Sequence, residues 1–314
     1  MTTLSQAIPW VRRIPIPFSR DQAMLLMAAI NEIFLGVDIF FAHRISGTIR
    51  PYEWIPIIFG PVAGVLLILA GIIALRRRKV ATLFATLVFI ASIVVGLLGT
   101  YFHLMRALLP NAPVGERVTV DLLVWAPPIL GPLTFCLAGL LGLSAAWIED
   151  PADSGVLRLL GSWRLRFPYS KTRGYFILVG LGTLATVVSS VLDHARTNFT
   201  NPWLWVPTLV GMFTMIVILT TSMMDKPNQA DIYIYIATMF LLILVGVTGS
   251  ALHISLNLAS DGTIVGERFI RGAPFMAPLL FANMGTLGLV ALMDPEEKVP
   301  LKLFTRKEKA VIET

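Results

Sequence analysis

HRISGTIRPYEWIP, residues 43–56, returns as HARTNFTNPWLWVP, residues 194–207, with its histidine, its two prolines and one tryptophan in the same places. The two stretches are 151 residues apart. A second pair, GLLGTYFH ending at His103 and GVTGSALH ending at His253, is 150 residues apart. These four stretches contain all 4 histidines of the chain. The sequence therefore reads as an internal duplication, and the positions that it keeps favour a site built from imidazole groups.

The composition indicates a membrane protein made of helices. Of the 314 residues, 56% are hydrophobic and 14% are charged, whereas a soluble protein carries charge on about a quarter of its residues. A helix that crosses a bilayer needs about 20 apolar residues. Eight blocks approach or exceed that length: 22–43, 54–75, 80–105, 122–147, 174–194, 205–224, 232–254 and 273–293. The expected fold is an all-α polytopic membrane protein, with eight transmembrane helices in two parallel four-helix repeats.

The domain divisions follow from the duplication. We expect a cytoplasmic N-terminus (1–21), a first transmembrane repeat (22–151), a basic cytoplasmic linker (152–173), a second repeat (174–295) and a cytoplasmic tail (296–314). Residues 156–167 of the linker mix leucine and aromatic residues with arginine. That mixture predicts either a short helix lying on the membrane surface or an ordinary loop.

Lys and Arg residues concentrate on one side of the predicted membrane. The N-terminus, the linker, the tail and two short loops on that side hold 18 of the 25, and the opposite loops hold seven. Because loops rich in these residues stay in the cytoplasm, both termini are expected there. The histidines then lie at the outer ends of their helices. The expected location is the inner or plasma membrane of a bacterium or archaeon.

Glycines precede two of the histidines at helical spacings. They lie four and seven residues before His103 and before His253, and are Gly99 and Gly96 in the first copy and Gly249 and Gly246 in the second. Residues at these spacings share one helix face. Each helix would then have a strip without side chains, where a flat macrocycle finds room. The pattern resembles the general design of b-type cytochromes, in which histidines on facing membrane helices bind haem.

The histidines allow two pairings, because all four are predicted at similar depth. Pairing within a repeat joins His43 to His103 and His194 to His253, and the alternative joins His43 to His194 and His103 to His253. Either way, imidazoles would bind haem iron as axial ligands, and one or two haem b groups are expected. Imidazole also suits copper and zinc, so a compact metal ion remains the competing hypothesis.

Charged side chains near the histidines extend the predicted site. Glu32 and Asp38 lie inside the first predicted helix, and Asp193 directly precedes a histidine. Ionisable groups within a membrane are costly and mark functional sites, so we expect these carboxylates to serve a quinone or to carry protons. Arg117 and Arg268 stand in matching Gly-Glu-Arg triplets. They are expected to pair with haem propionates or with loop carboxylates.

Prolines open the fourth and eighth predicted helices. They are Pro127, Pro128 and Pro132 in the first copy and Pro274 and Pro278 in the second. Such prolines kink or cap a helix and free backbone groups, which is tolerated where neighbouring protein satisfies them.

These observations together predict a b-type cytochrome-like membrane subunit. It would transfer electrons between the quinone pool and a redox partner on the outer face, within a larger respiratory oxidoreductase complex. The alternatives are a membrane protein that binds or transports copper, and a haem-free subunit that binds quinone or anchors a complex. The net charge of +6 belongs to the membrane topology, and nucleic acid is not an expected partner.

Overall fold

The computed structural model describes residues 4–8, 18–45, 47–112, 114–115, 118–159, 163–259 and 261–294. The helices of the first half are α1 (Leu4–Ala7), α2 (Arg20–Arg44), α3 (Trp54–Ala74), α4 (Arg78–Phe102), α5 (Val120–Trp125) and α6 (Leu130–Ala146). Those of the second half are α7 (Lys171–Ala195), α8 (Trp205–Met223), α9 (Gln229–Asn257), α10 (Gly266–Arg271) and α11 (Leu279–Ala291). A π-helical turn, His103–Leu108, and a 3-10 turn, Leu109–Asn111, continue α4. Further 3-10 turns, Pro51–Glu53 and Pro202–Leu204, precede α3 and α8.

Polar residues fix the points where three long helices begin. The Ser19 hydroxyl accepts a hydrogen bond from the backbone N–H of Gln22, whose side chain accepts from the Ser19 N–H in return. Asn228 and Asp231 form the same reciprocal arrangement at the start of α9. Ser170 caps α7 in the same way, with its hydroxyl alone. Each cap satisfies N–H groups that have no partner inside the helix.

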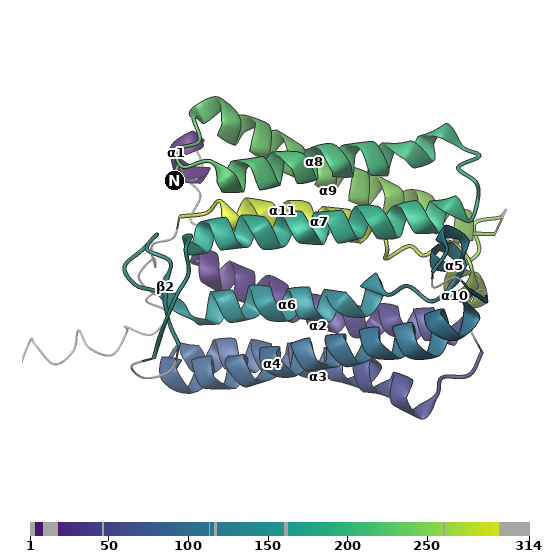
Figure 1. Ribbon diagram of the computed structural model, residues 1–314, viewed down its shortest axis with the longest axis horizontal. Helices are drawn as coiled ribbons and strands as arrows, with labels where there is room; N and C mark the ends of the chain where they lie inside the picture. The colour runs from purple at the N-terminus through teal and green to yellow at the C-terminus, as the bar shows by residue number, and fades with distance from the viewer. Residues whose placement is uncertain are drawn as a thin grey trace, which may run out of the picture.

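The helices pack in two groups (Figure 1). In the first group, α2 and α4 each pack against both α3 and α6, so that α2 and α4 lie diagonally opposite each other. In the second group, α7 and α9 each pack against both α8 and α11. The groups meet where α6 packs against α7 and where α11 packs against α2. Figure 1 shows the small β-sheet at one end of the helices and α5 and α10 at the other, which we call the sheet end and the histidine end.

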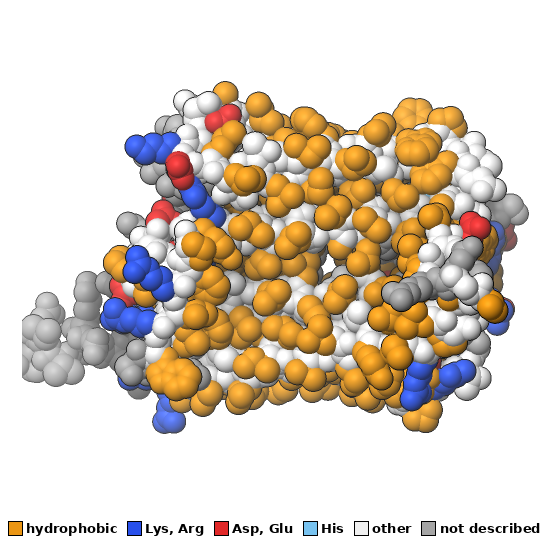
Figure 2. Space-filling model, in the orientation of Figure 1, with side chains coloured by type: hydrophobic (Ala, Val, Ile, Leu, Met, Phe, Trp, Pro, Cys, Tyr) orange, Lys and Arg blue, Asp and Glu red, His pale blue; other side chains and the backbone are white. Residues whose placement is uncertain are grey.

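Six helical segments are long and apolar enough to cross a membrane: Arg20–Arg44, Pro51–Ala74, Arg78–Asn111, Lys171–Ala195, Pro202–Met223 and Gln229–Asn257. These are the segments of a multi-pass membrane protein. Hydrophobic side chains cover the middle of the face shown in Figure 2, and charged side chains gather at its two ends.

The fourth and eighth predicted spans are shorter than expected. Proline lacks an N–H group and disfavours helical backbone in the residue before it. Pro127 and Pro128 accordingly separate α5 from α6, which has 17 residues, and α11 has 13 and begins only after Pro278. At about 1.5 Å per residue, neither helix reaches the roughly 30 Å of a bilayer core by itself.

The linker forms strands, so the helix predicted for residues 156–167 is wrong. A three-stranded antiparallel sheet joins β1 (Ile148–Glu149), β2 (Val156–Arg158) and β3 (Arg164–Arg166). Leucine alternates with arginine in β2 and β3, and Leu157 lies opposite Leu165. Such alternation places side chains on opposite faces of a strand. The linker is therefore a hairpin that folds against the end of the first group.

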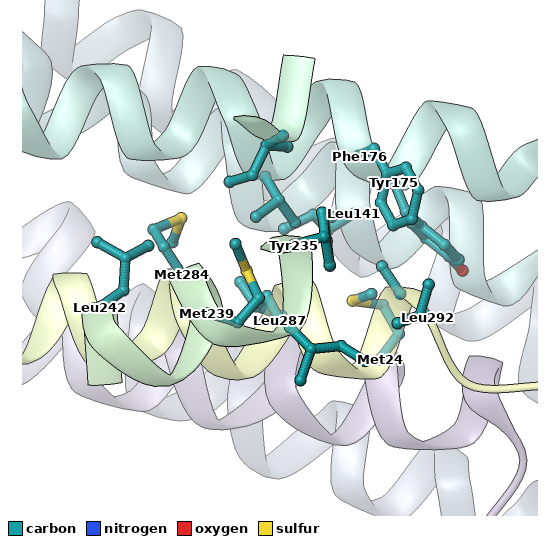
Figure 3. Close-up of a cluster of buried hydrophobic side chains, with 14 of the residues drawn as sticks. Met24, Leu141, Tyr175, Phe176, Tyr235, Met239, Leu242, Met284, Leu287 and Leu292 are labelled. Atoms are coloured by element: carbon teal, nitrogen blue, oxygen red, sulfur yellow. The ribbon is translucent and has the colours of Figure 1, made fainter. Parts of the chain in front are cut away.

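Two clusters of buried apolar side chains hold the helices together. The larger cluster crosses the boundary between the groups, because Met24 of α2 and Leu141 of α6 lie among side chains of the second group (Figure 3). The smaller one, which we call the first-group cluster, consists of Ala28, Ala29, Ala63, Leu67, Ala70, Ala85, Val88, Phe89, Leu143 and Ala146.

Charged residues join the starts of α2 and α7 at the sheet end. Lys171 donates to the Asp21 carboxylate and to the Trp147 carbonyl (2.7 Å). Arg20 in turn donates to the Thr172 hydroxyl over 2.7 Å. Lys171 and Thr172 stand 151 residues after Arg20 and Asp21, so the first residue of each helix contacts the second residue of the other.

Candidate functional site at the histidine end

The four histidines lie at or just beyond the C-terminal ends of four helices that all finish at the histidine end. His43 belongs to α2, His194 to α7 and His253 to α9, while His103 begins the π-helical turn after α4. All four side chains are half-buried. Short π-helical segments inside or after an α-helix occur frequently at functional sites.

The structure brings His43 and His103 together. Their ring centroids are 6.1 Å apart, and the ring planes meet at 73°. Two imidazoles that bind one metal ion from opposite sides through Nε2, at about 2.0 Å per bond, have centroids about 6 Å apart. The spacing of this pair is therefore compatible with two ligands of one metal ion, and equally with an edge-to-face contact of two rings.

His194 and His253 lie within electrostatic range of each other in the second group. The His194 ring also contacts the Phe199 ring, with centroids 6.2 Å apart. The arrangement agrees with pairing inside each helix group, and the binding of a ligand by either pair stays a prediction.

Backbone carbonyls orient three of the rings. His43 Nδ1 is 2.9 Å from the Ile39 oxygen, one helical turn earlier. His103 Nδ1 is 2.8 Å from the Pro128 oxygen, and His253 Nδ1 is 3.0 Å from the Pro274 oxygen. His194 Nδ1 is 3.4 Å from the Ser190 hydroxyl. The four histidines thus share a polar contact at the same ring nitrogen.

The proline spacing explains why two of these carbonyls reach a histidine. In a helix the carbonyl of residue i accepts from the N–H of residue i+4. Pro132 stands four residues after Pro128, and Pro278 four residues after Pro274. Since proline has no N–H group, neither carbonyl can accept from the residue four positions later. Both accept from a histidine, and the Pro274 carbonyl also accepts from the Ala277 N–H over 3.2 Å. The prolines alone did not predict the histidine as the partner.

These contacts select one form of the ring. A carbonyl can only accept, so a neutral imidazole beside it carries its proton on Nδ1 and keeps the lone pair on Nε2. Histidines that bind metals usually make this kind of contact with their second ring nitrogen, which fixes the tautomer and the ring direction. The local geometry therefore leaves the Nε2 lone pairs of His103 and His253 free of the carbonyl contact.

The four glycines before these histidines are packing positions. A Cβ atom on Gly96 would lie 2.6 Å from Cys136 Sγ, and one on Gly99 would lie 2.9 Å from Pro132 Cβ. In the second group the same contacts fall on α11: Gly246 meets Ala282, and Gly249 meets Pro278 at 2.9 Å. The strips expected to give a macrocycle room are thus filled by α6 and α11. They bring these helices close enough for their carbonyls to reach the histidines.

The predicted carboxylates separate into two places. Glu32 is fully buried and stands 11 residues before His43, which is about 16 Å along the helix, so it does not belong to the histidine pair. Asp38 of α2 and Asp193 of α7 lie close enough to repel each other. Asp193 also interacts with Arg196, at 3.9 Å.

The loop arginines of the two Gly-Glu-Arg triplets are described only in part. Arg117 lies outside the described residues. Glu267 of the second triplet forms an ion pair of 3.1 Å with Arg271, and both side chains are exposed. The pairing of Arg268 with a propionate or a loop carboxylate stays a prediction.

Within the part of the chain that the structure describes, no three His, Cys, Asp or Glu side chains form a group that could hold a metal ion. The candidate site is therefore a histidine pair in each helix group, not one cluster of four imidazoles. Comparison with family models, with curated proteins and with solved structures gives no match.

Proposed function

We propose that this protein is a membrane-embedded electron-transfer subunit resembling the b-type cytochromes, which exchanges electrons between quinone and a redox partner. The observation that carries the proposal is the His43–His103 pair, with its 6.1 Å spacing and with Nδ1 of both rings held by carbonyl oxygens. That arrangement suits two axial ligands of one iron atom. The second pair, His194 and His253, would hold a second group.

The histidine side chains suit haem as ligands, but the space beside the glycines does not suit its ring. Two neutral imidazoles with fixed Nδ1 protons form a suitable ligand set, and haem bound there would supply one-electron chemistry. The room expected beside Gly96 and Gly99, however, is taken by Pro132 and Cys136. The residues of this chain would hold the iron and fix the ligand orientation, and the half-buried histidines leave the site accessible from the histidine end.

A copper-binding protein is the second candidate, and the filled glycine strips favour it. A metal ion needs only its ligand atoms within reach, whereas a macrocycle needs an open face on each side. Imidazole binds copper as well as iron. The His43–His103 spacing fits either metal.

An absorbance spectrum of the purified protein separates the two candidates. After expression with ample haem, the dithionite-reduced minus oxidised spectrum is expected to show the bands of a haem with two histidine ligands. Pyridine haemochrome quantitation should give one or two haem groups per chain. A protein without haem that carries stoichiometric copper would move the assignment to the second candidate, and a protein with neither would refute both.

We further propose that the two helix groups are parallel repeats with four transmembrane segments each. Matching contacts support this proposal. His103 meets Pro128 as His253 meets Pro274, and Gly99 meets Pro132 as Gly249 meets Pro278. In each repeat the fourth segment would be the short helix α6 or α11, and residues before its prolines would complete the crossing.

The charge distribution supports a location in a bacterial or archaeal plasma membrane with the sheet end in the cytoplasm. Quinone and further subunits at the histidine end would be the partners.

Single cysteines tested with an impermeant thiol reagent should map this topology. In a Cys136→Ser background, the Asp261→Cys variant is expected to react from outside intact cells. The Ser154→Cys variant, altered in the sheet-end linker, is expected to react only after the cells are opened. The reverse result would place the histidines on the cytoplasmic face.

A further inference from the structure

Glu32 lies in the middle of the first helix group, and both of its carboxyl oxygens are enclosed. The residue is fully buried. Its Oε1 is 2.5 Å from the Ser92 hydroxyl, which is also 2.9 Å from the Phe135 carbonyl oxygen. Its Oε2 is buried and has no hydrogen-bond partner among the described residues. The proposed electron transfer uses none of these three residues.

Counting protons indicates which form of Glu32 this geometry holds. The Ser92 hydroxyl has one proton and lies beside two oxygen atoms. The Phe135 carbonyl cannot donate, so its contact with Ser92 uses the Ser92 proton. The contact between Ser92 and Glu32 then needs a second proton, which only Glu32 can supply. A carboxylic acid donating to Ser92, with Ser92 donating to Phe135, satisfies both contacts. An ionised carboxylate would satisfy at most one.

The surroundings offer no charge to stabilise an ionised Glu32. Its helix packs against α3, α6 and α11, none of which contains Asp, Glu, Lys, Arg or His, and Cys136 of α6 is their one titratable group. Facing helix α4 has charged residues only at its sheet-end start, Arg78 and Lys79. The short helix α10 brings its three charges, Glu267, Arg268 and Arg271, only to the histidine end. Burying an unpaired carboxylate costs several kcal/mol.

The first-group cluster lies entirely on one side of Glu32. Its α2 members, Ala28 and Ala29, precede Glu32, and Phe89 of α4 precedes Ser92. Helices α3 and α6 run in the opposite direction. Gly60 of α3 and Phe135 of α6 lie level with Glu32 and Ser92, and the cluster members of these two helices come after them in the chain. All ten side chains therefore stand between Glu32 and the sheet end.

Polar groups continue from Glu32 in the other direction. Ser92 lies beside Glu32, and the Cys136 thiol on the neighbouring helix contacts the Ile93 carbonyl. The Thr100 and Thr134 hydroxyls, which contact the Gly96 and Gly131 carbonyls, lie nearer the histidine end.

Apolar side chains of the first-group cluster fill the sheet-end side, and close packing of that kind leaves little room for water. Thr86 supplies a buried hydroxyl on that side, but this hydroxyl donates to the Thr82 carbonyl and accepts from Trp147. The histidine-end side has the hydroxyl and thiol groups named above.

We propose that Glu32 is a proton-binding site, held as a neutral carboxylic acid, that exchanges its proton with the histidine end and not with the sheet end. The ligand is a single proton, with Ser92 and the Phe135 carbonyl as its hydrogen-bond relay. The assignment does not rest on the proposed cytochrome function, because it holds for any occupant of the histidine pairs. Where that occupant gives up an electron, release of the Glu32 proton by this route compensates the charge change.

Infrared spectroscopy of the full chain in lipid bilayers tests the protonation. At neutral pH we expect a carbonyl stretching band of a protonated carboxyl group, which shifts on exchange from H2O to D2O. Glu32→Gln should abolish this band. Ser92→Ala should keep it but raise its frequency, because the acid O–H loses the hydroxyl oxygen to which it donates. Thr183→Val is the matched control, since Thr183 is the buried residue at the corresponding position of the second group, and it should leave the band unchanged.

Sealed proteoliposomes with the protein in one orientation test the direction of exchange. Raising the pH on the histidine side is expected to diminish the Glu32 band, and raising it on the sheet side alone should leave it unchanged. A band that survives Glu32→Gln, or that is missing from the wild-type protein, overturns the protonation. A band that follows the sheet-side pH, or neither side, overturns the exchange route. Each readout is independent of haem content, so failure here and failure of the cytochrome proposal are distinguishable.

Discussion

His103→Ala is expected to abolish haem binding in the first helix group and to leave the second group's haem in place. Haem iron with two axial imidazoles loses half of its protein ligands when one is removed, and the Nδ1 contact of the remaining ring, His43, lies within its own helix. Pyridine haemochrome quantitation should therefore show one haem fewer per chain. His253→Ala should remove the other haem with the same specificity, because its ring lies in the second group.

The hydrogen bond between His103 and the Pro128 carbonyl offers a finer test of the same site. Pro132→Ala restores a backbone N–H four residues after Pro128, so that the Pro128 carbonyl can accept within α6 and release His103. Removing such an orienting contact typically costs about 10–100-fold in metal affinity. Haem titration of the apoprotein should show weakened binding at the first site, with the second site unchanged. Loss of all haem from either single histidine variant would instead favour pairing between the helix groups. Unaltered haem content in His103→Ala would exclude this residue as a ligand.

Asp21→Asn is expected to destabilise the protein by about 3–5 kcal/mol, the usual cost of removing one partner from a buried ion pair. The Lys171 and Arg20 side chains are 1% and 2% exposed, and the Asp21 carboxylate forms an ion pair with each of them. Tyr175 also donates to this carboxylate, over 3.0 Å. An asparagine has nearly the same shape but removes the counter-charge that both enclosed cations contact. Thermal unfolding in detergent, followed by circular dichroism, should show a large fall in the midpoint temperature.

The surface pair Arg173–Asp225 provides the control for that experiment. Asp225 is 93% exposed, and its hydrogen bond from Arg173 lowers the pKa of the carboxyl group. Exposed ion pairs contribute little, because water screens them, so Asp225→Asn should barely move the midpoint. The double variant Asp21→Asn with Lys171→Met should regain part of the lost stability, because one of the two unpaired charges is gone. Equal effects of Asp21→Asn and Asp225→Asn would refute a structural role for the buried pair.

The sequence alone predicted the features that depend on local chemistry. The apolar blocks marked the long helices, six of which are apolar enough to cross a membrane. The glycines before His103 were recognised as one helix face. Their occupant was not predictable, because a bare helix face is open to a macrocycle and to a neighbouring helix alike. Only the position of α6 decides between them.

Distance along the chain explains the other errors. Leucine and arginine in residues 156–167 suited a surface helix or a loop, but β1 lies close enough to pair with this segment. Pro128 and His103 are 25 residues apart, so the hydrogen bond between them depends on the packing of two helices. Periodicity within one helix contains no such information.

The contact between the starts of α2 and α7 has a consequence for how the two halves could diverge. Two identical chains joined at this point would repeat each contact, so any charge placed there would occur twice. A single fused chain escapes that rule: Lys171 meets a carboxylate at Asp21, while Arg20 meets a hydroxyl at Thr172. The same freedom permits a carboxyl group at Glu32 and a hydroxyl at Thr183, its counterpart. Fusion thus allows one molecule to keep two related histidine pairs together with a single buried carboxyl group.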